Sequence, residues 1–307
     1  MMTSNAHRPP LIGALLTLSL IVFGAPWSPS QVASAQSQQL FLSVTDGSGE
    51  PVTDLRTDEL IVQWDDVDCE TLDLELIHWP VRVTVFVDNG DGGRAALQDM
   101  REGLKLFVDA IPAEVEVALA TLAGRAQFVT QLTSDREELV RGIDLIVPDS
   151  AGARFRDALV EEAGRLIDDD ERQYFPVIVM VASDGPEGSS SQQGAYDEML
   201  DRMTAASATV HTLMFTSGSP AQGQQVQIGM NLRNRTSGTY EALAISTGFR
   251  SMLPELGQNI ARKHHLVSNQ YRVTYAPPEG TTSVTAVRVS TSREAVTLTP
   301  TMDGNIQ

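Results

Sequence analysis

The sequence is poor in cysteine, in lysine and in long apolar segments. Cys69 is the single cysteine among 307 residues, so a disulfide within the chain is excluded. Its place in the alternating stretch Ile61–Ile77 predicts a buried structural thiol, with an intermolecular bridge as the alternative. The one pronounced apolar run, Leu11–Phe23, is shorter than the ~20 residues that a membrane-spanning helix needs.

This apolar run belongs to a segment typical of a secretory signal peptide. Arg8 places a positive charge before it, Pro26 follows it, and Ala33 and Ala35 are small residues two apart, as a cleavage site requires. We expect cleavage after about Ala35 and an extracytoplasmic product, periplasmic or secreted, with no membrane span. A retained membrane anchor is the alternative.

Basic residues are scarce relative to acidic ones. The chain has 22 lysines and arginines against 40 aspartates and glutamates, a formal net charge of −18. Such a surface repels nucleic acid and anionic lipid, so neither is expected as a partner.

Catalytic motifs are also lacking. The sequence contains no Gly-x-Ser-x-Gly elbow and no His-Glu-x-x-His pair, the signatures of two large hydrolase groups. No nucleophile, base and orienting group can be named together. We therefore predict that the protein is not an enzyme, and an extracytoplasmic hydrolase is the less favoured alternative.

The order of hydrophobic patterns predicts β structure, then alternating strands and helices, then β structure again. Residues 36–80 alternate apolar and polar side chains, which is typical of antiparallel strands. Residues 81–266 predict strands at Val81–Val87, Val115–Ala120, Gln127–Leu132, Phe175–Ala182 and Thr209–Phe215, and helices at Asp135–Ile146, Arg156–Ile167 and Tyr196–Ala206. Residues 267–307 return to β character. The predicted fold is α/β, with a doubly wound, mainly parallel sheet and flanking antiparallel segments from both chain ends.

Two local signals refine this outline. Ser134 and Glu137 form a capping-box pattern that predicts a serine cap for the helix Asp135–Ile146. The stretch Ser217–Gln227 is rich in glycine, serine and glutamine and predicts a loop.

The most informative stretch is "VRVTVFVDNGDGG", Val81 to Gly93. Asp88 follows one predicted buried strand, and Asp184 follows another, Phe175–Ala182. Ligands of open parallel sheets collect at the carboxyl ends of the strands. If the two strands are neighbours, the two carboxylates converge, an arrangement that suits a hard cation such as magnesium.

A dinucleotide site is one alternative for this glycine loop. Gly90, Gly92 and Ala95 fit the pattern G-x-G-x-x-A between a strand and a helix, which is the dinucleotide-binding fingerprint. Asp88 and Asp91 would then lie against a pyrophosphate and repel it. This interpretation is disfavoured.

A calcium loop is a second alternative. Asp88, Gly93 and Asp99 match positions 1, 6 and 12 of an EF-hand, but Gly90 and Gly92 stand at positions 3 and 5 and supply no side-chain oxygen. This interpretation is disfavoured too.

A family resemblance is carried by four stretches in this order: "LFLSVTDGSGEPVTDLRTDELIV", "VRVTVFVDNGDGG", "VIVMVASDG" and "NQYRVTYAPP". Together they resemble a von Willebrand factor type A domain, and most closely a bacterial exported group in which such a domain sits between a short β segment and a β tail. The resemblance covers most of residues 40–300.

The resemblance implies where a metal-ion-dependent adhesion site would lie. The family's first and last aspartates correspond to Asp88 and Asp184, its two serines to Gly90 and Gly92, and its threonine to about Ala153. Three hydroxyl ligands are therefore absent. We expect a degenerate site without a resident cofactor, at which magnesium or calcium binds weakly at most.

The resemblance also implies a function. We expect a protein that binds another protein of unknown identity, with metal-dependent adhesion to an acidic ligand, through magnesium, manganese or calcium, as the alternative. The expected ligand-facing residues are Asn89, Asp91, Ser189 and Ser190. The last two belong to the run Ser189–Gln193, which is expected to be a mobile loop.

Overall fold

A computed structural model describes residues 37–169, 172–216, 223–278 and 286–305. The predicted signal peptide and its cleavage site lie outside these residues. In the described part of the chain, no helix is both long and apolar enough to cross a membrane.

A six-stranded sheet occupies the middle of the chain, in the strand order β10-β9-β8-β5-β6-β7. Its strands are β5 (Val81–Val87), β6 (Glu116–Thr121), β7 (Gln127–Thr133), β8 (Phe175–Ser183), β9 (Thr209–Phe215) and β10 (Tyr240–Leu243). All neighbouring strands are parallel except β7, which runs antiparallel to β6 at one edge. Every residue of β8 is buried, as expected for a central strand covered on both faces.

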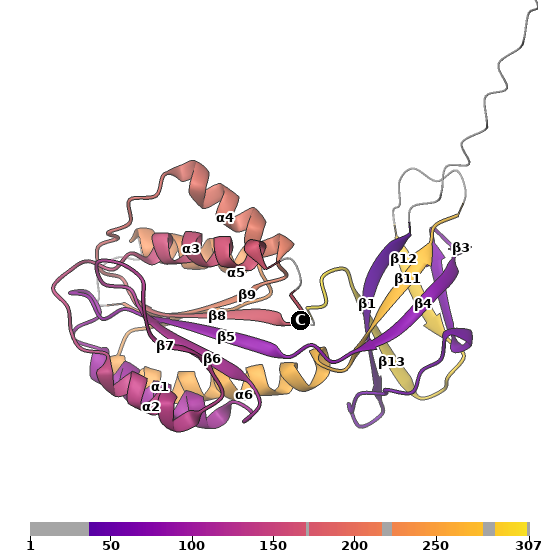
Figure 1. The fold of residues 1–307 in the computed structure, drawn as a ribbon, viewed down its shortest axis with the longest axis horizontal. Helices are drawn as coiled ribbons and strands as arrows, with labels where there is room; N and C mark the ends of the chain where they lie inside the picture. The colour runs from indigo at the N-terminus through magenta and orange to yellow at the C-terminus, as the bar shows by residue number, and fades with distance from the viewer. Residues whose placement is uncertain (1–36, 170–171, 217–222, 279–285, 306–307) are drawn as a thin grey trace, which may run out of the picture. The chain divides into compact units, whose positions relative to one another are not determined.

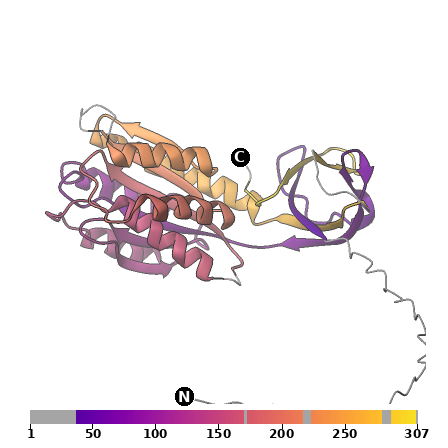
Figure 2. The same cartoon turned by 90° about the horizontal axis from the view of Figure 1, so that it is seen from above.

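Helices cover both faces of this sheet, as Figures 1 and 2 show. On one face lie α1 (Leu97–Ala110), α2 (Arg136–Leu145) and α6 (Phe249–Val267). On the other lie α3 (Phe155–Asp168), α4 (Gln193–Ala205) and α5 (Gln224–Arg235). This arrangement confirms the predicted doubly wound, mainly parallel α/β fold.

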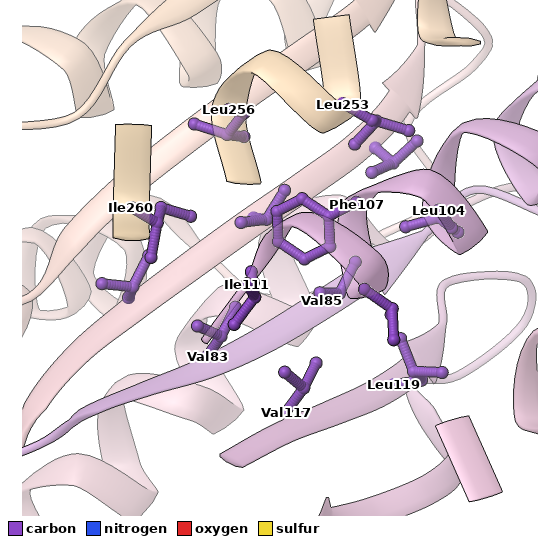
Figure 3. Close-up of a cluster of buried hydrophobic side chains, with 14 of the residues drawn as sticks. Val83, Val85, Leu104, Phe107, Ile111, Val117, Leu119, Leu253, Leu256 and Ile260 are labelled. Carbon is purple, nitrogen blue, oxygen red and sulfur yellow. The ribbon is translucent and has the colours of Figure 1, made fainter. Parts of the chain in front are cut away.

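The core of the first face is built around α1. Figure 3 shows apolar side chains of β5, β6, α1 and α6 meeting in one cluster, which includes Val85, Phe107 and Leu253. The two helices approach closely at Gly103, where an added Cβ would lie 2.4 Å from the backbone oxygen of Phe249. Each fully buried large apolar side chain contributes about 1.5–3 kcal/mol to the free energy of unfolding.

Strands from both ends of the chain build two further sheets. One has the order β13-β1-β11-β4 and the other β12-β2-β3. The bounds are β1 (Gln38–Asp46), β2 (Leu60–Trp64), β3 (Val67–Asp68), β4 (Glu70–Ile77), β11 (Gln270–Ala276), β12 (Val287–Thr291) and β13 (Val296–Thr301). Because β1 pairs antiparallel with both β11 and β13, the predicted flanking segments of the two chain ends form one sheet (Figure 1).

Three local predictions need correction. The cap of α2 is Asp135, whose side chain accepts the backbone N–H groups of Glu137 and Glu138, and not Ser134. Helix α5 begins at Gln224, inside the stretch predicted as a loop, because Val226 and other apolar residues of this polar segment are buried; residues 217–222 of that stretch lie outside the described residues. Cys69 is half-buried, and burial raises the pKa of its thiol.

Candidate functional site

The carboxyl edge of the six-stranded sheet, where its parallel strands end, holds the predicted site. β5 and β8 are neighbours, with Val87 paired to Val181. The two carboxylates were predicted to converge if these strands were neighbours, and this pairing is confirmed. Asp88 is 1% exposed, and its N–H donates to the backbone oxygen of Val181. Asp184 follows β8, and its N–H donates to the backbone oxygen of Phe215. Both aspartates therefore lie at the same edge.

The Asp88 carboxylate is held by groups of the protein itself. Ser183 donates its hydroxyl to Oδ2, and the N–H of Gly90 donates to Oδ1 at 2.9 Å. Burial raises the pKa of Asp88, and these hydrogen bonds offset part of that rise. Both oxygens of the first predicted metal ligand thus have donors before any ion is considered.

Ser183 is the site residue that sequence reasoning missed. It is the last residue of β8 and is fully buried. The available signal was a hydroxyl residue at the end of an otherwise apolar strand, immediately before Asp184. The pairing of β5 with β8 brings Ser183 to Asp88. The sequence alone does not show that these two strands are neighbours.

Gly92 packs against the loop that follows β8. A Cβ at Gly92 would lie 2.5 Å from the hydroxyl oxygen of Ser183 and 2.7 Å from Cα of Gly185. Real Cβ atoms do not approach so closely, so a side chain at Gly92 would have to displace backbone. The space that a serine would need at this position is filled.

Gly90 packs against a second loop. A Cβ there would lie 2.6 Å from the backbone oxygen of Ala151 and 3.3 Å from the backbone nitrogen of Ala153. Ala153 itself is 4% exposed, and its backbone oxygen accepts the N–H of Gly188 at 2.7 Å. The structure thus brings together Asp88, Gly90 and Ala153. In the family's motif these positions hold an aspartate, a serine and a threonine.

The donor set of this edge is poor in metal ligands. Within the described residues, no group of three or more histidine, cysteine, aspartate or glutamate side chains is placed to hold an ion. Magnesium requires a near-octahedral shell of oxygen atoms. The side chains present at positions 90, 92 and 153 supply none of them, so the residues do not fit the ion that the family's motif implies.

Asn89 was predicted to face a ligand, and the structure corrects this. The residue is 7% exposed. Its side-chain N–H donates to the backbone oxygen of Val147 at 2.9 Å, and its side-chain oxygen accepts the N–H of Ala123 at 3.2 Å. Asn89 therefore joins two neighbouring loops to the end of β5.

Asp91 lies on the surface of the carboxyl edge. It forms an ion pair with Arg94, with 3.1 Å between the nearest nitrogen and oxygen, and both side chains are more than half exposed. Such a pair contributes little to stability. The Asp91 carboxylate is accessible to a partner.

The serine run after β8 is tied to α3 and is not the free loop that was expected. The Asp157 carboxylate, in the first turn of α3, accepts the N–H groups of Ser190 and Ser191 at 3.0 and 2.9 Å. The hydroxyl of Ser189 accepts the N–H of Asp157 at 2.9 Å. Burial alone would raise the pKa of Asp157, but the hydrogen bonds hold it below its usual range. Ser190 remains exposed.

A sequence-family comparison agrees with this fold. Residues 84–187 match the sequence model of the von Willebrand factor type A domain. No curated protein sequence matches the chain. Among solved structures, a von Willebrand factor type A protein from Catenulispora acidiphila is 10% identical, with a TM-score of 0.50 over 87% of this chain and 72% of that one. The conserved hypothetical protein BatB from Bacteroides thetaiotaomicron is 15% identical, with a TM-score of 0.46 over 59% of this chain and 99% of that one.

Proposed function

Because the chain contains a von Willebrand factor type A domain, we propose that it is an exported, non-catalytic protein that binds another protein through the carboxyl edge of its six-stranded sheet. Its metal-ion-dependent adhesion site is degenerate, so binding does not depend on a cation. The export part of the proposal rests on the signal-peptide pattern of residues 1–35.

The packing around Gly90 and Gly92 carries this proposal. A hydroxyl ligand at either position would need space that is filled by Ala151, Ser183 and Gly185. Meanwhile Asp88 is buried and receives hydrogen bonds at both oxygens. An ion would have to displace these donors and recruit almost its whole shell from water, which opposes binding because magnesium needs fixed oxygen ligands at short distance.

The exposed chemistry of the edge supports a protein partner. Asp91, Asp149 and Ser190 are exposed there, on loops held by hydrogen bonds such as those of Asn89 and Asp157. Rigid loops lose little conformational entropy on binding. The acidic side chains favour a partner surface that carries basic residues.

Metal-dependent adhesion to an acidic ligand is the second candidate. It is favoured by one observation, the meeting of Asp88 and Asp184 at the same sheet edge. Thermal unfolding in EDTA, magnesium, manganese and calcium separates the two functions, because an ion at 100 times its dissociation constant stabilises the folded state by about 2.7 kcal/mol. We expect equal midpoints in all four conditions. A rise in one cation that disappears in Asp88→Asn would establish the second candidate.

Site-specific photo-crosslinking in the producing cells tests the binding surface. A crosslinker at Asp91, on the carboxyl edge, should capture a defined partner protein, and Asp91→Lys should weaken capture from a neighbouring position. Glu161, an exposed acidic residue on α3, is the matched control. A crosslinker placed there should not capture the partner, and Glu161→Lys should leave capture from the carboxyl edge unchanged. Equal capture from both positions would contradict a partner site at this edge.

A further inference from the structure

Two adjacent basic residues near the end of α6 have no acidic partner in the described part of the chain. Among the residues that the structure describes, Arg262 hydrogen-bonds only to Asn259, and Lys263 forms no ion pair or hydrogen bond. The second lysine of the sequence, Lys105, contrasts with it, because its amine lies 2.7 Å from a carboxylate oxygen of Asp144. Within the described residues of this acidic chain, these two neighbouring cations are therefore not neutralised by a carboxylate.

Both side chains line a cavity of about 190 Å³ between α6 and the strands beside it. The lining residues are His211 of β9, Thr239 just before β10, and Leu256, Asn259, Ile260, Arg262 and Lys263 of α6. None of these residues is acidic. Leu256 and Ile260, whose buried side chains are labelled in Figure 3, supply the apolar part of this lining.

The Lys263 ammonium is placed where a negative charge would stabilise it. The residue is half-buried, and burial lowers the pKa of its amine, because a desolvated ammonium without a counter-charge is disfavoured. A carboxylate beside it would replace the lost hydration with an ion pair and a charge-assisted hydrogen bond. The guanidinium group of Arg262 adds a second cationic donor to the cavity.

The imidazole ring of His211 lines the cavity and is uncharged at pH 7. Burial lowers its pKa to about 4, so the ring is uncharged. Its Nδ1 accepts the N–H of Thr239 at 3.2 Å, which places the proton of the neutral ring on Nε2. The charge of the cavity therefore comes from Lys263 and Arg262.

We propose that this cavity binds a small organic carboxylate with a short apolar body. The carboxylate pairs with Lys263 and Arg262, and the hydrocarbon packs against Leu256 and Ile260. The volume corresponds to roughly six water molecules, so the ligand has about six to eight non-hydrogen atoms. This site stands whether or not the carboxyl edge binds a protein, because it is formed by other elements.

Calorimetric titration of the full-length protein with hexanoate tests the proposal. We expect saturable binding of hexanoate at constant ionic strength. Hexanol, which keeps the apolar body, and inorganic phosphate, which keeps only the negative charge, should each bind at least tenfold more weakly. Lys263→Met retains the alkyl stem and should weaken hexanoate binding at least tenfold, whereas Lys105→Met should leave it unchanged.

Acetylation footprinting gives a second readout that needs no variant. The chain has only two lysines, so peptide mass spectrometry reports each amine separately. Saturating hexanoate should slow acetylation of Lys263 at least threefold and leave that of Lys105 unchanged. The proposal is overturned if hexanoate fails to bind, if it binds equally to Lys263→Met, or if both lysines react at unchanged rates in its presence.

Discussion

The hydroxyl oxygen of Ser183 lies 2.5 Å from Oδ2 of Asp88, across two neighbouring parallel strands. The aspartate that would begin a metal-dependent adhesion site is thus bonded to the last residue of β8. A buried carboxylate needs such donors because it has lost its water. The Ser183 hydroxyl therefore takes the place at this carboxylate oxygen that a cation would otherwise occupy.

This bond should be measurable in stability. Ser183→Ala leaves one oxygen of Asp88 without its donor, and we expect the free energy of unfolding in urea to fall by about 1–3 kcal/mol. In an Asp88→Asn background the same substitution should cost less, because the buried charge is gone. Ser150→Ala, at an exposed position of the same edge, is the control and should change stability by less than about 0.5 kcal/mol. Equal effects of Ser183→Ala and Ser150→Ala would refute this assignment.

Returning the missing hydroxyl should not restore a metal site. We expect Gly92→Ser to lower the free energy of unfolding by about 1–3 kcal/mol, because its Cβ would meet Ser183 and Gly185. Gly47→Ser is the matched control, since no atom lies within 4 Å of a Cβ at that position. Denaturant unfolding with and without magnesium measures both effects. A Gly92→Ser variant that is as stable as Gly47→Ser and gains stability from magnesium would show that the site is open.

His211 should make the protein sensitive to mild acid. Its pKa is lowered from 6.5 to about 4 by burial, so the unfolded chain binds a proton at pH values where the folded chain does not. The stability that the neutral ring contributes is full above pH 6.5 and is lost as the pH falls toward 4. Between pH 7.5 and 5 this loss amounts to about 2 kcal/mol.

Urea unfolding at several pH values isolates this contribution. The difference between wild type and His211→Asn should shrink by that amount from pH 7.5 to 5. His78→Asn, at an exposed histidine, is the matched control for the loss of a histidine. A difference between wild type and His211→Asn that does not vary with pH would show that His211 titrates normally.

Strong local signals explain which parts of the fold could be predicted. β8 was found because an uncharged apolar run of this length must be buried on both faces. The predicted helices over residues 135–146 and 156–167 were correct to within one or two residues, because their apolar side chains recur at helical spacing. Helix α5 was missed because glutamine and asparagine mask its apolar face, which only the packing of Val226, Ile228 and Leu232 reveals.

The residues of the candidate site also fall into those that the sequence could place and those that it could not. Asp88 and Asp184 could be placed at strand ends, since the end of an apolar run is visible in the sequence. Asn89 could not be assigned correctly, because the loops that bond to its side chain contain Ala123 and Val147, which are distant in sequence. The cap of α2 is Asp135, one residue after the predicted Ser134. Which of the two residues caps the helix depends on the backbone angles at the start of α2.

The sequence by itself determined the alternation of strands and helices, the acidic charge and the absence of hydroxyl side chains at Gly90 and Gly92, because each of these is a property of residue order or residue type. Only the tertiary structure decided that the space at these glycines is filled and that Ser183 bonds to Asp88. It also decided that Lys263 lies half-buried and has no acidic partner among the described residues. These features arise where segments far apart in the chain are brought within a few ångströms, and residue order alone does not specify such distances.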